Sequence, residues 1–114
     1  MPYLSIGPSG DNPYSLAVVS SSATSIAAIA GVTGQVTTVY KLLLVSGGTT
    51  NVAFLDGSTA LIGALPMVSG GSITLAADGT PWFVTSPGNT FNISNSGNLQ
   101  LSGSIYYRQS KFSV

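Results

Sequence analysis

Side chains that could do chemistry are few in this sequence. Its 114 residues include three acidic residues, all of them Asp, and no His or Cys. Catalytic triads, cysteine nucleophiles, common zinc sites and disulfide frameworks all need His or Cys, so they are excluded. Asp56 and Asp78 each precede a Gly, as turn-forming Asp residues do. They lack the spacing of a calcium loop and the contrasting environments of a glycosidase pair. We therefore expect no enzyme activity, no metal and no cofactor.

The remaining candidate for chemistry is Lys41, which stands in an otherwise apolar stretch. A Ser–Lys pair needs a desolvated lysine beside a serine, and serine is so frequent here that adjacency carries no information. A strand lysine more often marks a sheet edge or extends its amine to solvent, and we expect one of these. The glycine-rich stretch Ser69–Ser72 lacks the Gly-Lys-Ser/Thr ending of a phosphate loop.

The composition favours a folded domain that associates with other protein. Charged residues make up 5% of the chain and the net charge is zero, against about 25% charged residues in an average domain. The 44% of hydrophobic residues argues against disorder, and three Lys/Arg leave nucleic-acid binding without its main source of energy. Because a net charge near zero promotes association, we expect a homo-oligomer and no nucleic-acid partner. A secreted monomer with a Ser/Thr surface is the alternative.

The first part of the chain divides into an arm and two short strands. Residues 1–13 hold three of the six prolines and predict an extended N-terminal arm, not a signal peptide. Its apolar side chains would dock on its own domain, residues 14–114, or on a neighbour. The stretch Leu16–Val32 is too polar at its centre to span a membrane, so no membrane partner is expected. It predicts strands near 14–20 and 24–30, with a helix over Ala23–Ala30 as the local alternative.

The rest of the chain predicts β structure throughout. Residues 36–46 are rich in β-branched residues and become apolar on both faces after Val39, which is typical of a central strand covered on both sides. Residues 98–108 alternate between apolar and polar side chains, and Gly103 among them indicates a bulge or the close approach of another backbone. Shorter strands are expected between glycine-containing turns, at 51–55, 59–68 (interrupted by Gly63 and Pro66), 72–76, 82–85 and 90–94. About eight or nine short strands of this kind predict a single-domain antiparallel β-sandwich, jelly-roll-like or immunoglobulin-like, with a small barrel as the alternative.

Aromatic residues near strand ends are the best candidates for an interface. Trp82 and Phe83 are neighbours in a strand and must face opposite ways, so one is core and the other is exposed or buried by a partner. Tyr106 and Arg108 lie on the polar side of the last strand. Surface aromatics with polar groups are favoured at interfaces and in sugar-binding platforms. The candidate interface residues are Tyr3, Leu4, Ile6, Trp82, Tyr106, Arg108 and Phe112, with Tyr106 first.

One resemblance covers residues 39–108. These residues contain, in order, VYKLLLVS, NVAFLDGSTAL, a Gly-Gly hairpin, DGTPWFVTSPGNTFNIS and L-x-L-x-G-x-I-Y-Y. In this order they resemble small β-sandwich decoration, or cement, proteins of tailed bacteriophage capsids. The resemblance implies a non-enzymatic virion structural protein, made in the host bacterial cytoplasm, that binds the outer surface of the major capsid protein lattice. There it would bridge neighbouring subunits, often as a trimer.

A second function is compatible with the same residues and is the alternative interpretation. A phage tail, fibre or carbohydrate-binding module of this fold would use Trp82, Tyr106 and Tyr107 as a stacking platform for a host-surface glycan.

Overall fold

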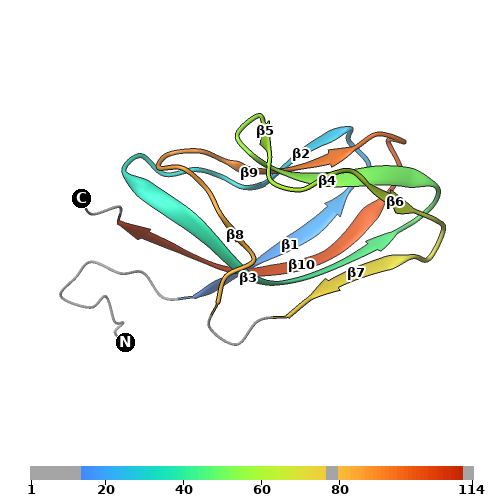
Figure 1. Cartoon of the computed structure of the whole chain (residues 1–114). Coiled ribbons are helices and arrows are strands. Elements are labelled where there is room, and N and C mark those ends of the chain that lie inside the picture. The colour runs from blue at the N-terminus through green and yellow to red at the C-terminus, as the bar shows by residue number, and fades with distance from the viewer. Residues whose placement is uncertain (1–13, 77–79, 112–114) are drawn as a thin grey trace.

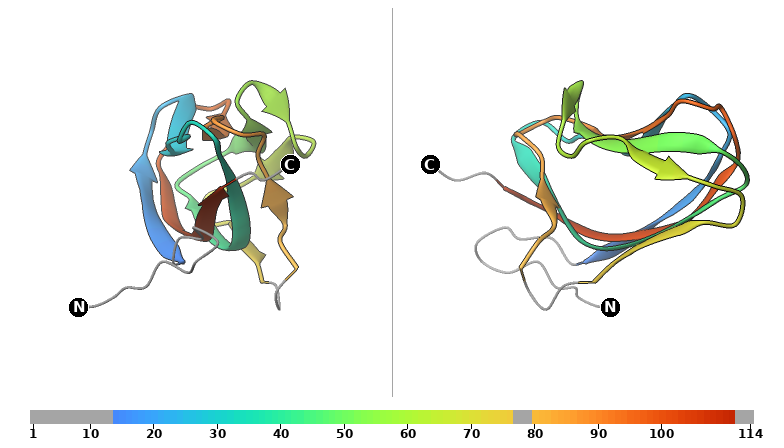
Figure 2. Two further views of the ribbon diagram at one scale, coloured as in Figure 1. Left: turned by 90° about the vertical axis from the view of Figure 1, so that its left-hand side faces the viewer. Right: turned by 45° about the vertical axis from the view of Figure 1, so that its right-hand side comes forward.

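Two antiparallel sheets pack face to face in the computed structural model, which describes residues 14–76 and 80–111 (Figure 1). The first sheet consists, in order, of β1 (Ser15–Ser21), β10 (Leu101–Lys111), β3 (Gln35–Ser46) and β7 (Ser72–Leu75), with β8 (Phe83–Val84) beside the other half of β3. The second sheet consists of β2 (Ser25–Ile29), β9 (Phe91–Asn95), β4 (Thr50–Asp56) and β5 (Thr59–Ala60), with β6 (Leu65–Met67) also paired to β4. Figure 2 shows the two layers from the end and obliquely.

The pairing of the strands follows the order of a jelly roll. The first strand pairs with the last, β1 with β10, and the next pairs are β2 with β9, β3 with β7, and β4 with β5 and β6. The chain is therefore folded like one long hairpin that is wound across both sheets. This confirms the predicted sandwich and favours the jelly-roll-like form over the immunoglobulin-like one. The described residues form ten strands because the strand expected over 59–68 is split into β5 and β6.

Most predicted strands are present, including the one expected near 24–30, and the start of the last strand is corrected. The segment 24–30 forms β2, not a helix, because Ile26 and Ile29 pack on the core and tertiary burial outweighs the helix propensity of alanine. The strand expected over 98–108 begins only at Leu101. Asn98 precedes it with a positive φ of 54°, and its amide donates to the carbonyl of Asn95 at 3.1 Å, so it belongs to a turn.

A bulge in β3 changes which of its residues face the core. Tyr106 pairs with Lys41 and the next residue, Tyr107, pairs with Val39, so Tyr40 is the extra residue. Before the bulge Val39 is buried, and after it Leu42 is buried. The alternation therefore switches at Tyr40, as β-bulges require.

Three phenylalanines from both sheets form the centre of the core. The rings of Phe54 and Phe83 lie 5.3 Å apart between centroids, and each lies 5.9 Å from the ring of Phe91. Phe83 is buried whereas Trp82 is exposed, which confirms that one of the pair belongs to the core. The other fully buried apolar side chains are Val39, Leu44, Val52, Ile93, Leu101 and Ile105.

Gly103 allows a close approach between β10 and β3. A Cβ atom at this position would overlap the carbonyl oxygen of Leu43 and would lie 2.8 Å from its carbonyl carbon. The predicted close backbone approach is thus confirmed. The predicted cover on both sides of β3 is wrong for the described residues, because Leu43 and Val45 point away from the core and remain exposed.

Candidate functional site

The side of the first sheet that faces away from the second sheet, called here the outer face, carries exposed apolar side chains. Strand register places Leu16, Tyr106 and Lys41 in one row across the sheet. The next row contains Val18, Ser104, Leu43 and Thr74. Residues paired across strands share a face. The exposed fractions are 62% for Leu16, 77% for Val18, 44% for Leu43 and 37% for Val45.

The corresponding side of the second sheet has a different composition. Its rows consist of Ser25, Ser94 and Ala53, and then of Ala27, Asn92 and Leu55. Small and polar residues predominate there, as expected of a strand face in contact with water. Large branched apolar residues thus gather mainly on the outward side of the first sheet, whereas Leu55 is the one such residue in these two rows of the second. Contiguous exposed apolar surface of this kind marks interaction sites.

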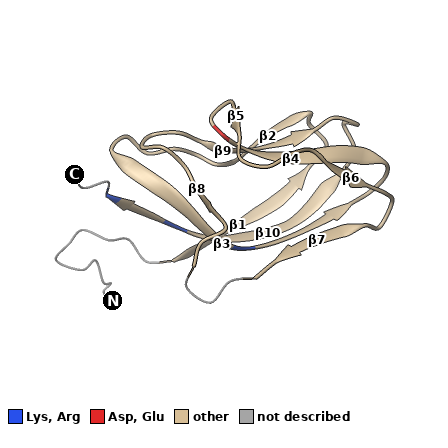
Figure 3. Cartoon of the chain, viewed as in Figure 1, with Lys and Arg blue, Asp and Glu red and all other residues tan. Residues whose placement is uncertain are grey.

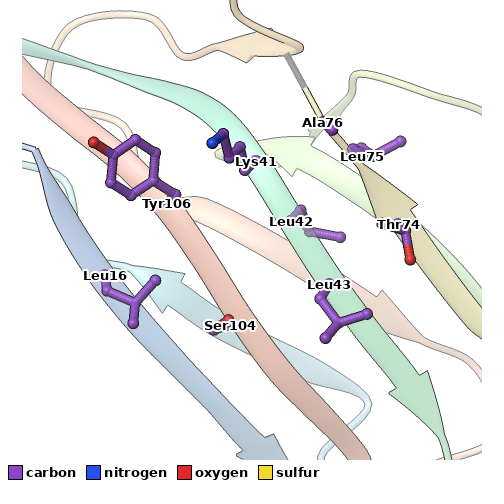
Figure 4. Close-up of a pocket in the computed structure, with 9 residues that line it drawn as sticks. All are labelled: Leu16, Lys41, Leu42, Leu43, Thr74, Leu75, Ala76, Ser104 and Tyr106. Atoms are coloured by element: carbon purple, nitrogen blue, oxygen red, sulfur yellow. The ribbon is translucent and has the colours of Figure 1, made fainter. Parts of the chain in front are cut away.

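A depression of about 350 Å³ lies in the outer face (Figure 4). Leu16 and Tyr106 border it on one side and Thr74 and Ala76 on the other, with Leu43 between them. Sites for small ligands combine an apolar lining with a few convergent polar groups that fix the orientation of the ligand. Here the polar groups that line the depression are one amine, one phenol and two hydroxyls, and they are spread over β3, β7 and β10. The surface suits an apolar protein segment better than a polar small molecule.

Three tyrosines and two cations border one end of the outer face. The ring of Tyr14 stacks on that of Tyr106 with centroids 5.1 Å apart and meets the ring of Tyr40 edge-on at 5.2 Å. The guanidinium of Arg108 lies 5.4 Å from the Tyr14 centroid, and the Lys41 amine lies 5.6 Å from that of Tyr106. Burial, followed by the neighbouring Tyr14, raises the pKa of Tyr40 above its usual 10.0 more than Arg108 lowers it. Tyr106 and Arg108 are therefore on one face, as predicted.

Trp82 extends the outer face beyond β7. Its indole Nε1 donates a hydrogen bond to the carbonyl of Ala76 at 3.0 Å, and its side chain is 49% exposed. Val84, in the strand β8 that follows Trp82, pairs with Thr38 and is also exposed. A buried tryptophan usually pairs its N–H, and this one is paired although half of the ring is accessible. The ring is therefore held in place at the rim of the depression.

Charge is distributed unequally between the two sheets (Figure 3). Lys41 and Arg108 belong to the first sheet, whereas Asp56 ends β4 in the second. Oδ2 of Asp56 accepts hydrogen bonds from the amide and hydroxyl of Ser86, and Oδ1 accepts one from Asn89 Nδ2 at 2.9 Å. Partial burial raises the pKa of Asp56, but these bonds outweigh that effect and lower it below the usual 3.8.

This carboxylate joins the end of β4 to the loop between β8 and β9, so it does more than the turn-forming role that the sequence predicted. Within the described ranges, no group of three or more His, Cys, Asp or Glu could hold a metal ion.

The residues that the sequence predicted for an interface are only partly among those that the structure describes. Trp82, Tyr106 and Arg108 lie on the outer face. The predictions for Tyr3, Leu4, Ile6 and the arm 1–13, and for Phe112, fall outside the described residues. Lys41 does not mark a sheet edge, since β3 lies between β10 and β7, but its side chain is exposed, as the second expectation required.

Sequence reasoning missed the main apolar residues of the outer face, Leu16, Val18, Leu43 and Val45. The sequence contained a signal for Leu43 and Val45, because residues 36–46 are apolar on both faces beyond Val39. That pattern was interpreted as a strand covered on both sides within one chain. In the folded domain the described residues cover only the core side of β3. Any cover of its outward side must therefore come from elsewhere.

No helix in the described parts of the chain is long and apolar enough to cross a membrane. Comparisons with known protein families, with curated proteins and with solved structures found no match.

Proposed function

We propose that this chain is a non-enzymatic virion structural protein of the capsid-decoration type. It binds the outer surface of the major capsid protein lattice, bridges neighbouring subunits and acts as a homo-oligomer on the virion. The observation that carries the proposal is the exposed apolar outer face of the first sheet, where Leu16, Val18 and Leu43 lie in adjoining rows. The resemblance of residues 39–108 to cement proteins supports it independently of the structure.

The chemistry of the outer face determines how such binding behaves. Its apolar residues favour association by burial of surface from water, which salt does not screen. Lys41 and Arg108 are the charged residues on the described part of this face. Long-range attraction between charges is screened as the Debye length falls from about 10 Å at 0.1 M salt to about 3 Å at 1 M. Binding through the outer face should therefore persist in high salt.

Co-sedimentation with expanded capsids of the encoding phage tests the proposal. The wild-type chain should sediment with capsids at both low and high salt. Leu43→Lys places a charge at the centre of the outer face and should abolish co-sedimentation. Ala27→Lys makes the matched change at an exposed position of the second sheet and should sediment like the wild type. Loss of binding in high salt, or equal binding by Leu43→Lys, would count against the proposal.

The alternative is a tail, fibre or carbohydrate-binding module. Jelly rolls occur in both capsid and lectin domains, so the fold does not decide between them. The expected platform of Trp82, Tyr106 and Tyr107 is not formed on one face, because Tyr107 packs against the core. Tyr106 stacks on Tyr14, which covers one face of the Tyr106 ring. These contacts favour the decoration reading, and specific binding on a glycan array would favour the alternative.

A further inference from the structure

The edges of the two sheets differ in how they are protected against pairing with another chain. Short strands, prolines and bulges are the usual protection. One edge of the first sheet is divided between β7 with four residues and β8 with two. One edge of the second sheet is divided between β5 with two residues and β6 with three, of which one is Pro66. At its opposite edge, β2 has a register shift between Ala27 and Ile29.

The edge formed by β1 has none of these features. β1 has seven residues, Ser-Leu-Ala-Val-Val-Ser-Ser, with no charge, proline or glycine. It pairs with β10 residue for residue from Ser15 to Ser21 without a register shift. On its other side no described strand pairs with it. Because an antiparallel strand directs alternate residues' N–H and C=O groups to each side, β1 presents a row of backbone donors and acceptors along this edge.

We propose that β1 of two copies of this chain pair antiparallel about a two-fold axis. The partner of this edge is thus a second copy, and the two first sheets become one continuous sheet. Main-chain hydrogen bonds supply affinity in such strand addition, and the facing side chains supply specificity. The two-fold makes the contact isologous, so each residue of β1 meets its symmetry counterpart.

One register uses the whole length of β1. With Val18 on the axis, Val18 lies opposite the partner's Val18, and Leu16 lies opposite the partner's Ser20. Every residue from Ser15 to Ser21 then has a partner, and no like charges oppose each other because β1 has none. This register also covers Val18, whose side chain is 77% exposed in the single chain. Apolar β-branched side chains paired across strands stabilise a sheet.

The pairing has a geometric consequence for the outer face. A two-fold axis perpendicular to the joined sheet places the outer faces of both copies on the same side. The depressions bordered by Leu16 in each copy then flank the new strand pair. The proposal rests on the properties of the β1 edge and not on the proposed function. It gives a dimer where the resemblance to cement proteins implies a trimer.

Mass measurement of the full chain in solution, by light scattering or sedimentation equilibrium, tests the proposal. The expected mass is twice the 11.5 kDa of one chain. Val18→Lys and Val18→Glu each place like charges opposite one another across the axis. Each should raise the dissociation constant of the dimer by about tenfold or more, because the Val–Val contact is also lost. An equimolar mixture of the two variants should restore a dimer containing one chain of each.

Leu43→Lys is the matched control, since Leu43 lies on the same face but on the central strand β3. It should leave the dimer intact while it abolishes capsid binding, which separates this proposal from the proposed function. A thermal transition for Val18→Lys near that of the wild type confirms that the variant folds. A monomeric or trimeric wild-type chain, dimers of either Val18 variant alone, or a mixture that does not pair would each overturn the proposal.

Discussion

Replacement of Gly103 by Ala tests the packing of the first sheet most sharply. Gly103 lies in β10 opposite Leu44 on one side and Val19 on the other. The added Cβ would overlap the Leu43 carbonyl oxygen and lie 3.0 Å from the Leu44 Cα. These are backbone atoms of the central strand β3, which β7 holds on its far side. The clash therefore cannot be relieved by rotation of a side chain.

The change in the free energy of unfolding that Gly103→Ala causes follows from two opposing effects. Overpacking in a close-packed interior costs about 1–3 kcal/mol, and backbone contact places this case at the upper end. The lower entropy of the unfolded chain with Ala in place of Gly returns about 0.4–1 kcal/mol. We expect a net loss of about 2 kcal/mol or more in the free energy of unfolding. That is a large part of a total stability of about 5–15 kcal/mol.

Urea unfolding followed by the fluorescence of Trp82, the single tryptophan, measures this loss at fixed protein concentration. The midpoint should fall while the slope m stays constant, as for a change in stability alone. Gly63→Ala is the control, because a Cβ there would meet nothing within 4 Å, and it should remain within about 0.5 kcal/mol of the wild type. If Gly103→Ala is equally stable, the description of the β10–β3 contact is wrong.

Two further substitutions test polar contacts. Asp56→Asn should cost about 1 kcal/mol at pH 7, since a carboxylate is a stronger acceptor than an amide. Because the folded pKa lies below 3.8, this contribution is present above the unfolded pKa and is lost as pH falls through the folded pKa. Urea titrations should therefore converge for variant and wild type at low pH, and a constant gap would contradict the assignment. Thr50→Val removes the buried hydroxyl that donates to Asn95 Oδ1 at 2.6 Å and accepts from the Gly97 amide at 2.7 Å. It should cost about 1–3 kcal/mol in thermal unfolding, whereas Thr50→Ser should be close to the wild type; equal losses would show that the hydroxyl is not the cause.

The strands were predictable because alternation records which side chains face the core. In β10, Ile105 is buried and Tyr106 is directed outward, as the pattern of apolar and polar residues indicated. The bulge at Tyr40 was not predictable, because it is defined by the pairing of β3 with β10. A strand that switches faces at a bulge looks apolar on both faces when its sequence is read alone. This is one reason why β3 was expected to be covered on both sides.

The site was predictable only in part, for a related reason. Tyr106 and Arg108 could be placed on one face because polar neighbours marked that face. For Trp82 and Phe83 the pattern required one to be buried without saying which one, and packing against Phe54 and Phe91 selects Phe83. Leu16 and Val18 were missed because an apolar residue on an unpaired surface has the same sequence signature as one in a core.

The proposed function requires that the outer face of the first sheet binds the capsid. The most direct measurement is an electron cryo-microscopy reconstruction of expanded capsids, of the phage to which the proposed function assigns the chain, after incubation with the purified chain. We expect additional density on the outer surface of the shell, oriented with β1, β10, β3 and β7 toward the major capsid protein and with Leu43 within contact distance. Bound density with β2, β9 and β4 toward the shell, or no bound density at saturating protein, would contradict it.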